Sequence, residues 1–121
     1  MTRIAIIEDD QAISQMYRFK FENEGFEVEL ADNGQDGLML IEQYKPHIVL
    51  LDLMMPVMNG DEMLEKLREK AWGRNVDVYV LTNIGEQEIP HSIKKHNVKK
   101  IILKAELTPK QVVDIVKKET K

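Results

Sequence analysis

The chain of 121 residues has a mass of 14.1 kDa, which fits one folded domain. Its formal net charge of −4 argues against a dedicated nucleic-acid binder, because such domains are basic. The absence of cysteine excludes disulfides, thiolate metal sites and cysteine nucleophiles. No apolar run approaches the length of a membrane span, and the first residues do not form a signal-peptide pattern, so we expect a cytoplasmic protein.

Short apolar runs alternate with apolar residues at helical spacing along the whole chain. The apolar runs predict strands, in chain order, over residues 3–7, 26–30, 48–51, 76–81 and 99–103. The residues that mark the intervening and final helices are Ile13, Met16, Tyr17 and Phe21; Leu38, Ile41 and Tyr44; Met63, Leu64 and Leu67; Ile89 and Ile93; and Val112, Val113 and Val116. The pattern is therefore a strand followed by a helix, five times over.

Several helix ends are marked by residues with special backbone preferences. Gly25 predicts the end of the first helix. The fourth helix is expected to begin near Pro90 and to end at Asn97, which tolerates the left-handed conformation. Thr108 is expected to cap the last helix, with Pro109 at its first position.

Strict alternation of strand and helix predicts a parallel sheet with helices on both faces. The fold class that we expect is α/β: a flavodoxin-like (βα)5 doubly wound sandwich with strand order 2-1-3-4-5. No linker or composition break divides the sequence. We therefore expect one domain over residues 1–121, without an effector domain.

Charged and hydroxyl side chains follow the predicted strands. The first strand ends at residues 8–10 (Glu-Asp-Asp), the third at Asp52, the fourth at Thr82 and the fifth at Lys104. Ligands of open parallel sheets bind at the carboxyl ends of the strands, so these side chains are expected to converge. Carboxylates brought together repel one another, and a magnesium ion relieves that repulsion. With a lysine and a hydroxyl beside them, they indicate phosphoryl transfer to Asp52.

Other phosphate-binding sites leave no trace at these positions. The glycine-rich run of a P-loop is absent, and acidic residues occupy the turn where a dinucleotide-binding fold has its glycines. A flavodoxin would have a phosphate loop rich in hydroxyl groups and glycine there. The aspartate pair of haloacid-dehalogenase phosphatases is not matched either, because Glu8 stands at the first position. The remaining alternative is structural: Asp9 or Asp10 alone could cap the first helix.

Four motifs, in order and at matching spacing, resemble the receiver domain of two-component response regulators, the CheY-like family. They are Ile-Ile-Glu-Asp-Asp at residues 6–10, Leu-Asp-Leu-Met-Met-Pro at 51–56 with Asn59-Gly60, Leu81-Thr82, and Leu103-Lys104. The resemblance extends over essentially the whole chain. It implies a phosphoacceptor module that takes a phosphoryl group from a histidine kinase or a histidine phosphotransfer protein. Such a module catalyses only its own phosphorylation and slow dephosphorylation.

The resemblance also implies the metal site. Asp52 would accept the phosphoryl group and, with Asp9, would bind Mg²⁺ directly, with Mn²⁺ as an alternative ion. Glu8 would act on the metal mainly through water, and Met54 would contribute its backbone carbonyl. Asp10 would have a supporting role at most.

The remaining roles concern the phosphoryl group and the signal. Lys104 would contact the phosphoryl oxygens, and Thr82 would report the modification. The sequence departs from the family pattern at three positions: Ala105 replaces the proline after the lysine, Ile101 replaces an aromatic residue, and Asn83 replaces a small one. We expect a trans peptide bond before Ala105, because a cis bond to a non-proline residue costs about 3 kcal/mol.

The side chains at Met54 and Ile84 are apolar, and they stand where a polar group would hold a hydrolytic water. We therefore expect a long-lived aspartyl phosphate. Asn83 is a modulating residue, because its amide could reach the same water. Any conformational switch at Ile101 would use an aliphatic side chain.

The resemblance implies a partner surface on the fourth helix, fifth strand and fifth helix. From Lys94 to Lys121 there are nine basic and three acidic residues, which favours acidic protein partners. The first helix, with Phe19 beside its apolar stripe, is the expected face for the kinase. We expect a monomer or a phosphorylation-dependent dimer, with no direct nucleic-acid or membrane contact. The alternatives are a degenerate, phosphorylation-independent interaction domain on the same fold and a small hydrolase or flavin carrier.

Overall fold

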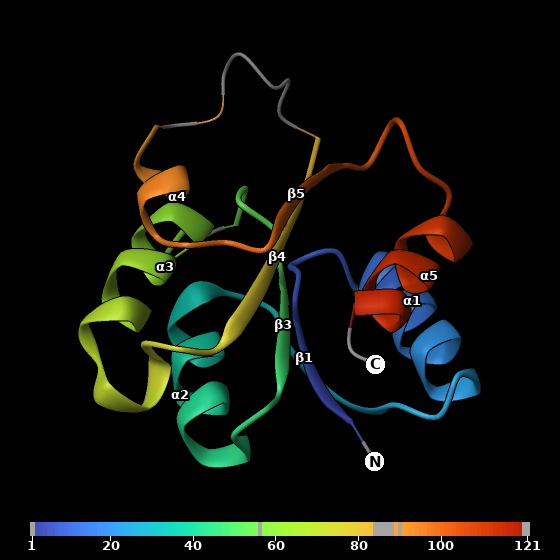
Figure 1. The fold of residues 1–121 in the computed structure, drawn as a ribbon, viewed down its shortest axis with the longest axis horizontal. Coiled ribbons are helices and arrows are strands. Elements are labelled where there is room, and N and C mark those ends of the chain that lie inside the picture. The colour runs from blue at the N-terminus through green and yellow to red at the C-terminus, as the bar shows by residue number, and fades with distance from the viewer. Residues whose placement is uncertain (1, 56, 84–88, 90, 120–121) are drawn as a thin grey trace.

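The computed structural model describes residues 2–55, 57–83, 89 and 91–119, which form a parallel sheet between two layers of helices (Figure 1). The strands are β1 (Arg3–Ile7), β2 (Glu27–Ala31), β3 (Ile48–Leu51), β4 (Asp77–Thr82) and β5 (Lys100–Leu103). The helices are α1 (Gln11–Asn23), α2 (Gly34–Tyr44), α3 (Gly60–Glu69), the 3₁₀ turn η1 (Ala71–Gly73), α4 (His91–Lys95) and α5 (Pro109–Glu119). The strand order is β2-β1-β3-β4-β5, which confirms the predicted topology.

Two apolar clusters fill the spaces between the sheet and the helices. Helices α1 and α5 cover one face, and α2, α3 and α4 cover the other (Figure 1). Alternate β1 residues serve the two clusters: Ile4 and Ile6 point toward α1 and α5, whereas Ala5 and Ile7 point toward α2 and α3. Burial on both faces explains why the central strands are continuously apolar in sequence.

Two predicted strands, 26–30 and 76–81, are displaced by one residue, and a third, 99–103, begins one residue later than predicted. Phe26 lies between α1 and β2, where its backbone N–H donates to the Phe21 carbonyl at 3.1 Å and its ring packs edge-on against the Phe21 ring. Thr82 belongs to β4, because it pairs in register with Leu103. Lys99 precedes β5, although its N–H donates to the Val78 carbonyl at 2.8 Å. The errors therefore fall where a turn or a ladder extends past the apolar run.

The helix ends follow the local chemistry that the sequence indicates. Gly25 has a φ of 91°, and Asn97 has a φ of 58°, so both adopt the left-handed conformation after a helix. Thr108 Oγ1 accepts from the Gln111 N–H at 3.2 Å and caps α5, which begins at Pro109. Pro90, the expected start of α4, lies outside the described residues.

Helix α4 contains only five residues, and side chains of α3 hold both of its ends. At one end, Ser92 Oγ donates to Asp61 Oδ1 at 2.8 Å. At the other, the Arg68 guanidinium donates to backbone carbonyls after α4 and before β4. Its five acceptors are the carbonyls of His96, Asn97, Gly73, Arg74 and Val76, at 2.7–3.2 Å. Burial of the guanidinium lowers the pKa of Arg68.

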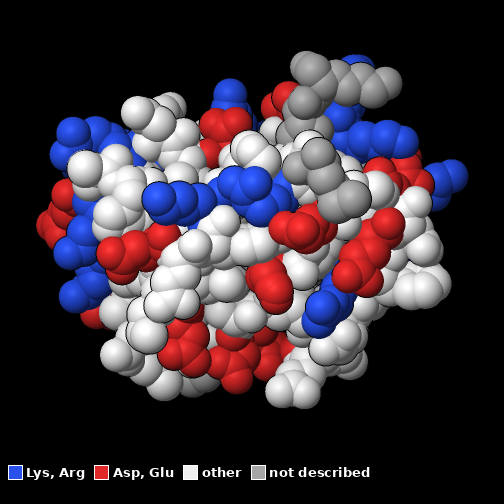
Figure 2. Space-filling model, turned by 90° about the horizontal axis from the view of Figure 1, so that it is seen from below, with Lys and Arg blue, Asp and Glu red and all other residues white. Residues whose placement is uncertain are grey.

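Figure 2 views the molecule from below Figure 1, at the amino ends of the strands. Acidic and basic side chains are interspersed on this face, without a large area of one sign. None of the helices in the described part of the chain combines the length and the apolar character of a bilayer span.

Candidate metal and phosphoryl site

The two buried carboxylates of the site lie directly after neighbouring strands. Strands β1 and β3 pair in parallel with Ile7 opposite Leu51, so Glu8 and Asp52 emerge side by side. The Asp52 N–H donates to the Ile7 carbonyl at 3.0 Å, and the Glu8 N–H donates to the Ala31 carbonyl at 3.0 Å. These bonds continue the ladder past the strand ends and fix both backbones. Sheet register therefore sets where the carboxylates lie.

Glu8, Asp9 and Asp52 form an acidic cluster. One carboxylate oxygen from each lies within 4.8 Å of the others. Glu8 and Asp52 are buried, whereas Asp9 is exposed. Partial desolvation, followed by the hydrogen bond and charge of Glu8, raises the pKa of Asp9. Convergent carboxylate oxygens with an open, water-accessible side are the ligands that Mg²⁺ prefers, so these residues fit the ion that the sequence predicts.

Lys104 is the cation of the site. Its Nζ lies 2.6 Å from Glu8 Oε1 and 3.6 Å from Asp52 Oδ2, and its side chain is 13% exposed. The Lys104 N–H donates to the Thr82 carbonyl at 2.8 Å, which holds the residue at the end of β5. The short contact with Glu8 was not predicted from the sequence, which assigned Glu8 to the metal and Lys104 to the phosphoryl group. The glutamate side chain reaches Lys104 because it extends beyond the strand end.

The loop after Asp52 is held close to the acidic cluster. The Met54 N–H donates to Asp52 Oδ1 at 3.2 Å and orients that carboxylate. Gly60 donates its N–H to the Leu53 carbonyl at 3.0 Å, and a Cβ at this position would lie 2.6 Å from the Asp52 carbonyl oxygen. Only glycine permits this approach. Asn59 then caps α3 by accepting from the Glu62 N–H at 2.9 Å.

Two further predicted residues border the same space. A cavity of about 370 Å³ is lined by Glu8, Asp9, Asp10, Ile13, Asp52, Met54, Asn83 and Lys104. The Met54 side chain is 62% exposed at its mouth. Asn83 is exposed at the end of β4, whereas Ile84 lies outside the described residues.

The other candidate residues have separate positions. Asp10 caps α1, because its Oδ1 accepts from the Ile13 N–H at 3.1 Å, and its own N–H donates to Glu8 Oε2 at 3.2 Å. Thr82 is fully buried at the end of β4. Ile101 is half-buried on β5 and borders a different cavity, described below. The described residues contain no cis peptide bond, so the bond before Ala105 is trans as expected.

The profile of the response regulator receiver domain matches residues 4–117. The chain belongs to this family. The match includes the acidic cluster and Lys104. Receiver domains bind Mg²⁺ through acidic residues and interact with kinases or phosphotransfer proteins, and they are not enzymes of the ordinary kind.

Curated relatives of this receiver domain are longer regulators. The phosphate regulon regulatory protein PhoB of Rhizobium meliloti is 31% identical over 87 residues, which cover 72% of this chain and 38% of the relative. The CpxR homolog of Haemophilus influenzae is 41% identical over 87 residues, covering 71% of this chain and 36% of the relative. The aligned regions thus span less than two fifths of these relatives.

Solved structures share the whole fold. A CheY-like receiver domain from Methanospirillum hungatei superimposes with a TM-score of 0.88 at 28% identity, covering 98% of this chain and 93% of that one. A LuxR-family DNA-binding response regulator from Staphylococcus aureus gives a TM-score of 0.85 at 29% identity, with full coverage of both chains. The CheY4 protein of Vibrio cholerae, at 22% identity and a TM-score of 0.88, supports the fold alone.

Proposed function

We propose that this receiver domain, residues 1–121, accepts a phosphoryl group on Asp52 from a histidine kinase or a histidine phosphotransfer protein. The observation that carries the proposal is the position of Lys104 Nζ, 3.6 Å from Asp52 Oδ2 within a cluster of three carboxylates. A buried carboxylate beside both a cation and further acidic ligands suits phosphoryl transfer, which depends on positioning and charge neutralisation.

Glu8, Asp9, Asp52 and the Met54 carbonyl would hold Mg²⁺, or Mn²⁺ in its place. The ion, when bound, neutralises negative charge on the carboxylates and on the incoming phosphoryl oxygens. An Asp52 oxygen attacks the donor phosphorus, and the bond from phosphorus to the donor imidazole nitrogen breaks, with its electron pair staying on nitrogen. The Met54 N–H, bonded to Asp52 Oδ1, orients the attacking carboxylate for this step.

Lys104 and Thr82 act on the transferred group. The Lys104 ammonium, now paired with Glu8, would turn toward the phosphoryl oxygens as a point charge. The Thr82 hydroxyl would donate to one of those oxygens and so report the modification. Asn83, and Ile84 beyond the described residues, would modulate access, with Asp10 supporting α1.

The proposed output is a protein contact through α4, β5 and α5. Ile101 on β5 is half-buried, so a change of its packing is the proposed switch. Phe19 on α1 is 65% exposed and offers an apolar contact for the kinase. The receiver would act in the cytoplasm, as a monomer or a phosphorylation-dependent dimer, and touch neither nucleic acid nor membrane directly.

Incubation with acetyl phosphate and Mg²⁺, followed by intact mass measurement, tests the proposal. We expect a mass increase of one phosphate that disappears in Asp52→Asn and remains in Asp114→Asn, a matched change at an exposed position on α5. No increase in the parent, together with no binding of beryllofluoride, would instead support a degenerate interaction domain. A phosphate that survives Asp52→Asn would assign the acceptor elsewhere.

A further inference from the structure

Strand β5 is an edge of the sheet. It pairs only with β4, so in the described part of the chain its outer edge has no strand partner. An edge strand presents unpaired backbone donors and acceptors, to which another extended chain can bind. All four residues of β5 border a cavity of about 330 Å³ that runs beside this edge.

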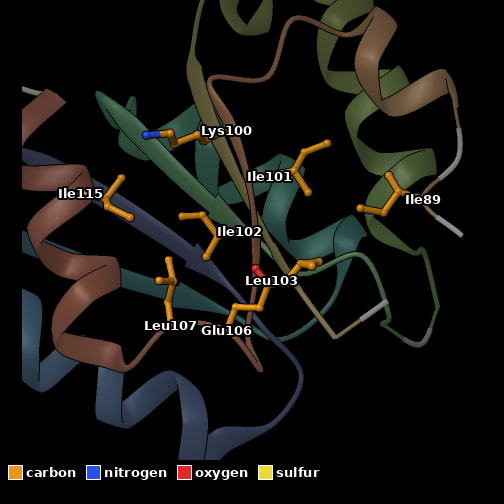
Figure 3. A pocket seen from close by; sticks show the side chains of 8 residues that line it. All are labelled: Ile89, Lys100, Ile101, Ile102, Leu103, Glu106, Leu107 and Ile115. Carbon is orange, nitrogen blue, oxygen red and sulfur yellow. The ribbon is translucent and has the colours of Figure 1, made fainter. Parts of the chain in front are cut away.

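The cavity has apolar walls on both sides of the strand (Figure 3). Ile101 points toward Ile89 near α4, whereas Ile102 points toward Leu107 and Ile115 on the α5 side. Successive side chains of an added strand also point to opposite faces. Each would therefore meet an apolar wall, whichever way it points.

Charge is distributed unevenly near β5, where Lys100, which lines the cavity, is paired with Glu119 at 3.3 Å. Exposed Lys95 and Lys99 lie just before β5, and exposed Glu106 lies beyond its other end. Among the described residues Lys95 forms no ion pair, and the only ion-pair partner of Lys99 is Asp77, at 4.0 Å. The beginning of the strand is thus complementary to carboxylates.

We propose that the outer edge of β5 binds an extended acidic and apolar segment of a partner protein, which adds a sixth strand to the sheet. The segment places apolar side chains against the two walls and its carboxylates beside Lys95 and Lys99. Four strand residues span about 13 Å, so a segment of similar length suffices. A helix is a poorer occupant, because its backbone groups are already bonded internally and leave the β5 edge unpaired. The proposal names the partner class for the output face proposed above and rests on that function.

A capped peptide with two glutamates followed by Val-Ile-Val-Lys is a suitable probe. We expect it to bind the unmodified protein, with slower amide exchange along residues 100–103. A matched peptide, N-methylated at alternate residues, keeps the side chains and loses backbone donors. It should bind at least tenfold more weakly, and equal binding of the two peptides would overturn strand addition.

Charge reversal at the lysines before β5 tests whether the carboxylates of the peptide lie beside them, and it does not change the core. Lys95→Glu with Lys99→Glu should weaken binding of the acidic peptide about tenfold, whereas Lys66→Glu with Lys70→Glu, at exposed positions on and directly after α3, should leave its affinity unchanged. Equal losses of affinity in both variants, or no binding of the peptide at all, would overturn the proposal. Light scattering that shows a dimer paired through this edge would overturn it as well. Because this titration needs no phosphate, its failure is distinguishable from failure of Asp52 to accept a phosphoryl group.

Discussion

Two lysine–glutamate pairs with the same 2.6 Å separation lie in different parts of the molecule. Lys104 and Glu8 meet at the carboxyl end of the sheet, with side chains 13% and 5% exposed. Lys117 and Glu24 join α5 to the end of α1, with side chains 45% and 38% exposed. Water surrounds the second pair and screens it, whereas the first pair lies in a medium where charges interact strongly. An identical distance between the charged atoms therefore says little about how much a pair contributes to the stability of the fold.

The surroundings of the buried pair increase the difference. Lys104 also faces Asp52 at 3.6 Å, so one ammonium offsets two buried carboxylates. In the exposed pair, the hydrogen bond and charge of Lys117 lower the pKa of Glu24, and those of Glu24 raise the pKa of Lys117. The buried pair is thus part of a charge balance, and the exposed pair is a local contact.

Lys104→Met should have the largest effect on stability of the substitutions that test this difference between the two pairs. The substitution leaves Glu8 and Asp52 buried without their cation, which costs on the order of 3 kcal/mol of unfolding free energy. Urea unfolding in EDTA measures the loss, and millimolar Mg²⁺ should recover part of it. If Lys117→Met is equally destabilising, burial does not distinguish the pairs.

Asp9→Asn should weaken Mg²⁺ binding, measured by calorimetry, on the order of tenfold, because it removes one of three anionic ligands. It should also slightly stabilise the metal-free protein. The raised pKa of Asp9 means that its ionised form is disfavoured in the folded state. The parent should accordingly gain stability as the pH falls through that pKa, and Asp9→Asn should lose this gain. Unchanged Mg²⁺ affinity would contradict the assignment.

Met54→Asn should shorten the lifetime of the aspartyl phosphate several-fold. Met54 is an uncharged, exposed member of the charged site, and an amide there can hold a water that a thioether holds poorly. One added hydrogen bond to the transition state is worth about 1 kcal/mol, or about fivefold in rate. Decay of phosphorylated protein, followed by mass, measures the effect. Met39→Asn, on the exposed surface of α2, is the control. An equal change of the phosphate lifetime in this variant would contradict the role assigned to Met54.

Lys117→Met should have the smallest effect, a change in melting temperature that is not resolved at neutral pH. Because the pKa of Glu24 is lowered, the pair stabilises the fold above the ordinary glutamate pKa, and this contribution disappears as the pH falls through the lowered value. Salt should remove it as well. If Lys117→Met is clearly less stable than the parent in high salt, the contact contributes more than the attraction of two charges.

The fold could be predicted because burial on both faces leaves a continuous apolar signal in the strands. β3, for instance, is Ile-Val-Leu-Leu and is fully buried. The ends of the strands are harder to predict. Phe26, for example, is apolar like a strand residue, but it precedes β2 and packs on the Phe21 ring. The convergence of Glu8 and Asp52 followed from strand order alone.

Other features depend on side-chain reach and could not be found in a linear pattern. The Glu8–Lys104 contact joins residues 96 positions apart and depends on where the two long side chains end. Arg68 resembles any solvated arginine in the last turn of a helix. Nothing in its neighbours indicates that its guanidinium binds five carbonyls. The β5 cavity likewise depends on how α4 and the loop before α5 are placed.

The carbonyls around Arg68 also bear on the order of folding. They belong to the segment before β4 and to the turn before β5, so the guanidinium has its full set of acceptors only once α3 and both segments have docked. We expect a contact whose full set of acceptors requires three docked segments to be weak in the transition state for folding. Its removal, as in Arg68→Met, should leave the folding rate nearly unchanged and accelerate unfolding. We therefore expect Arg68 to determine how long the folded chain persists rather than how fast it assembles.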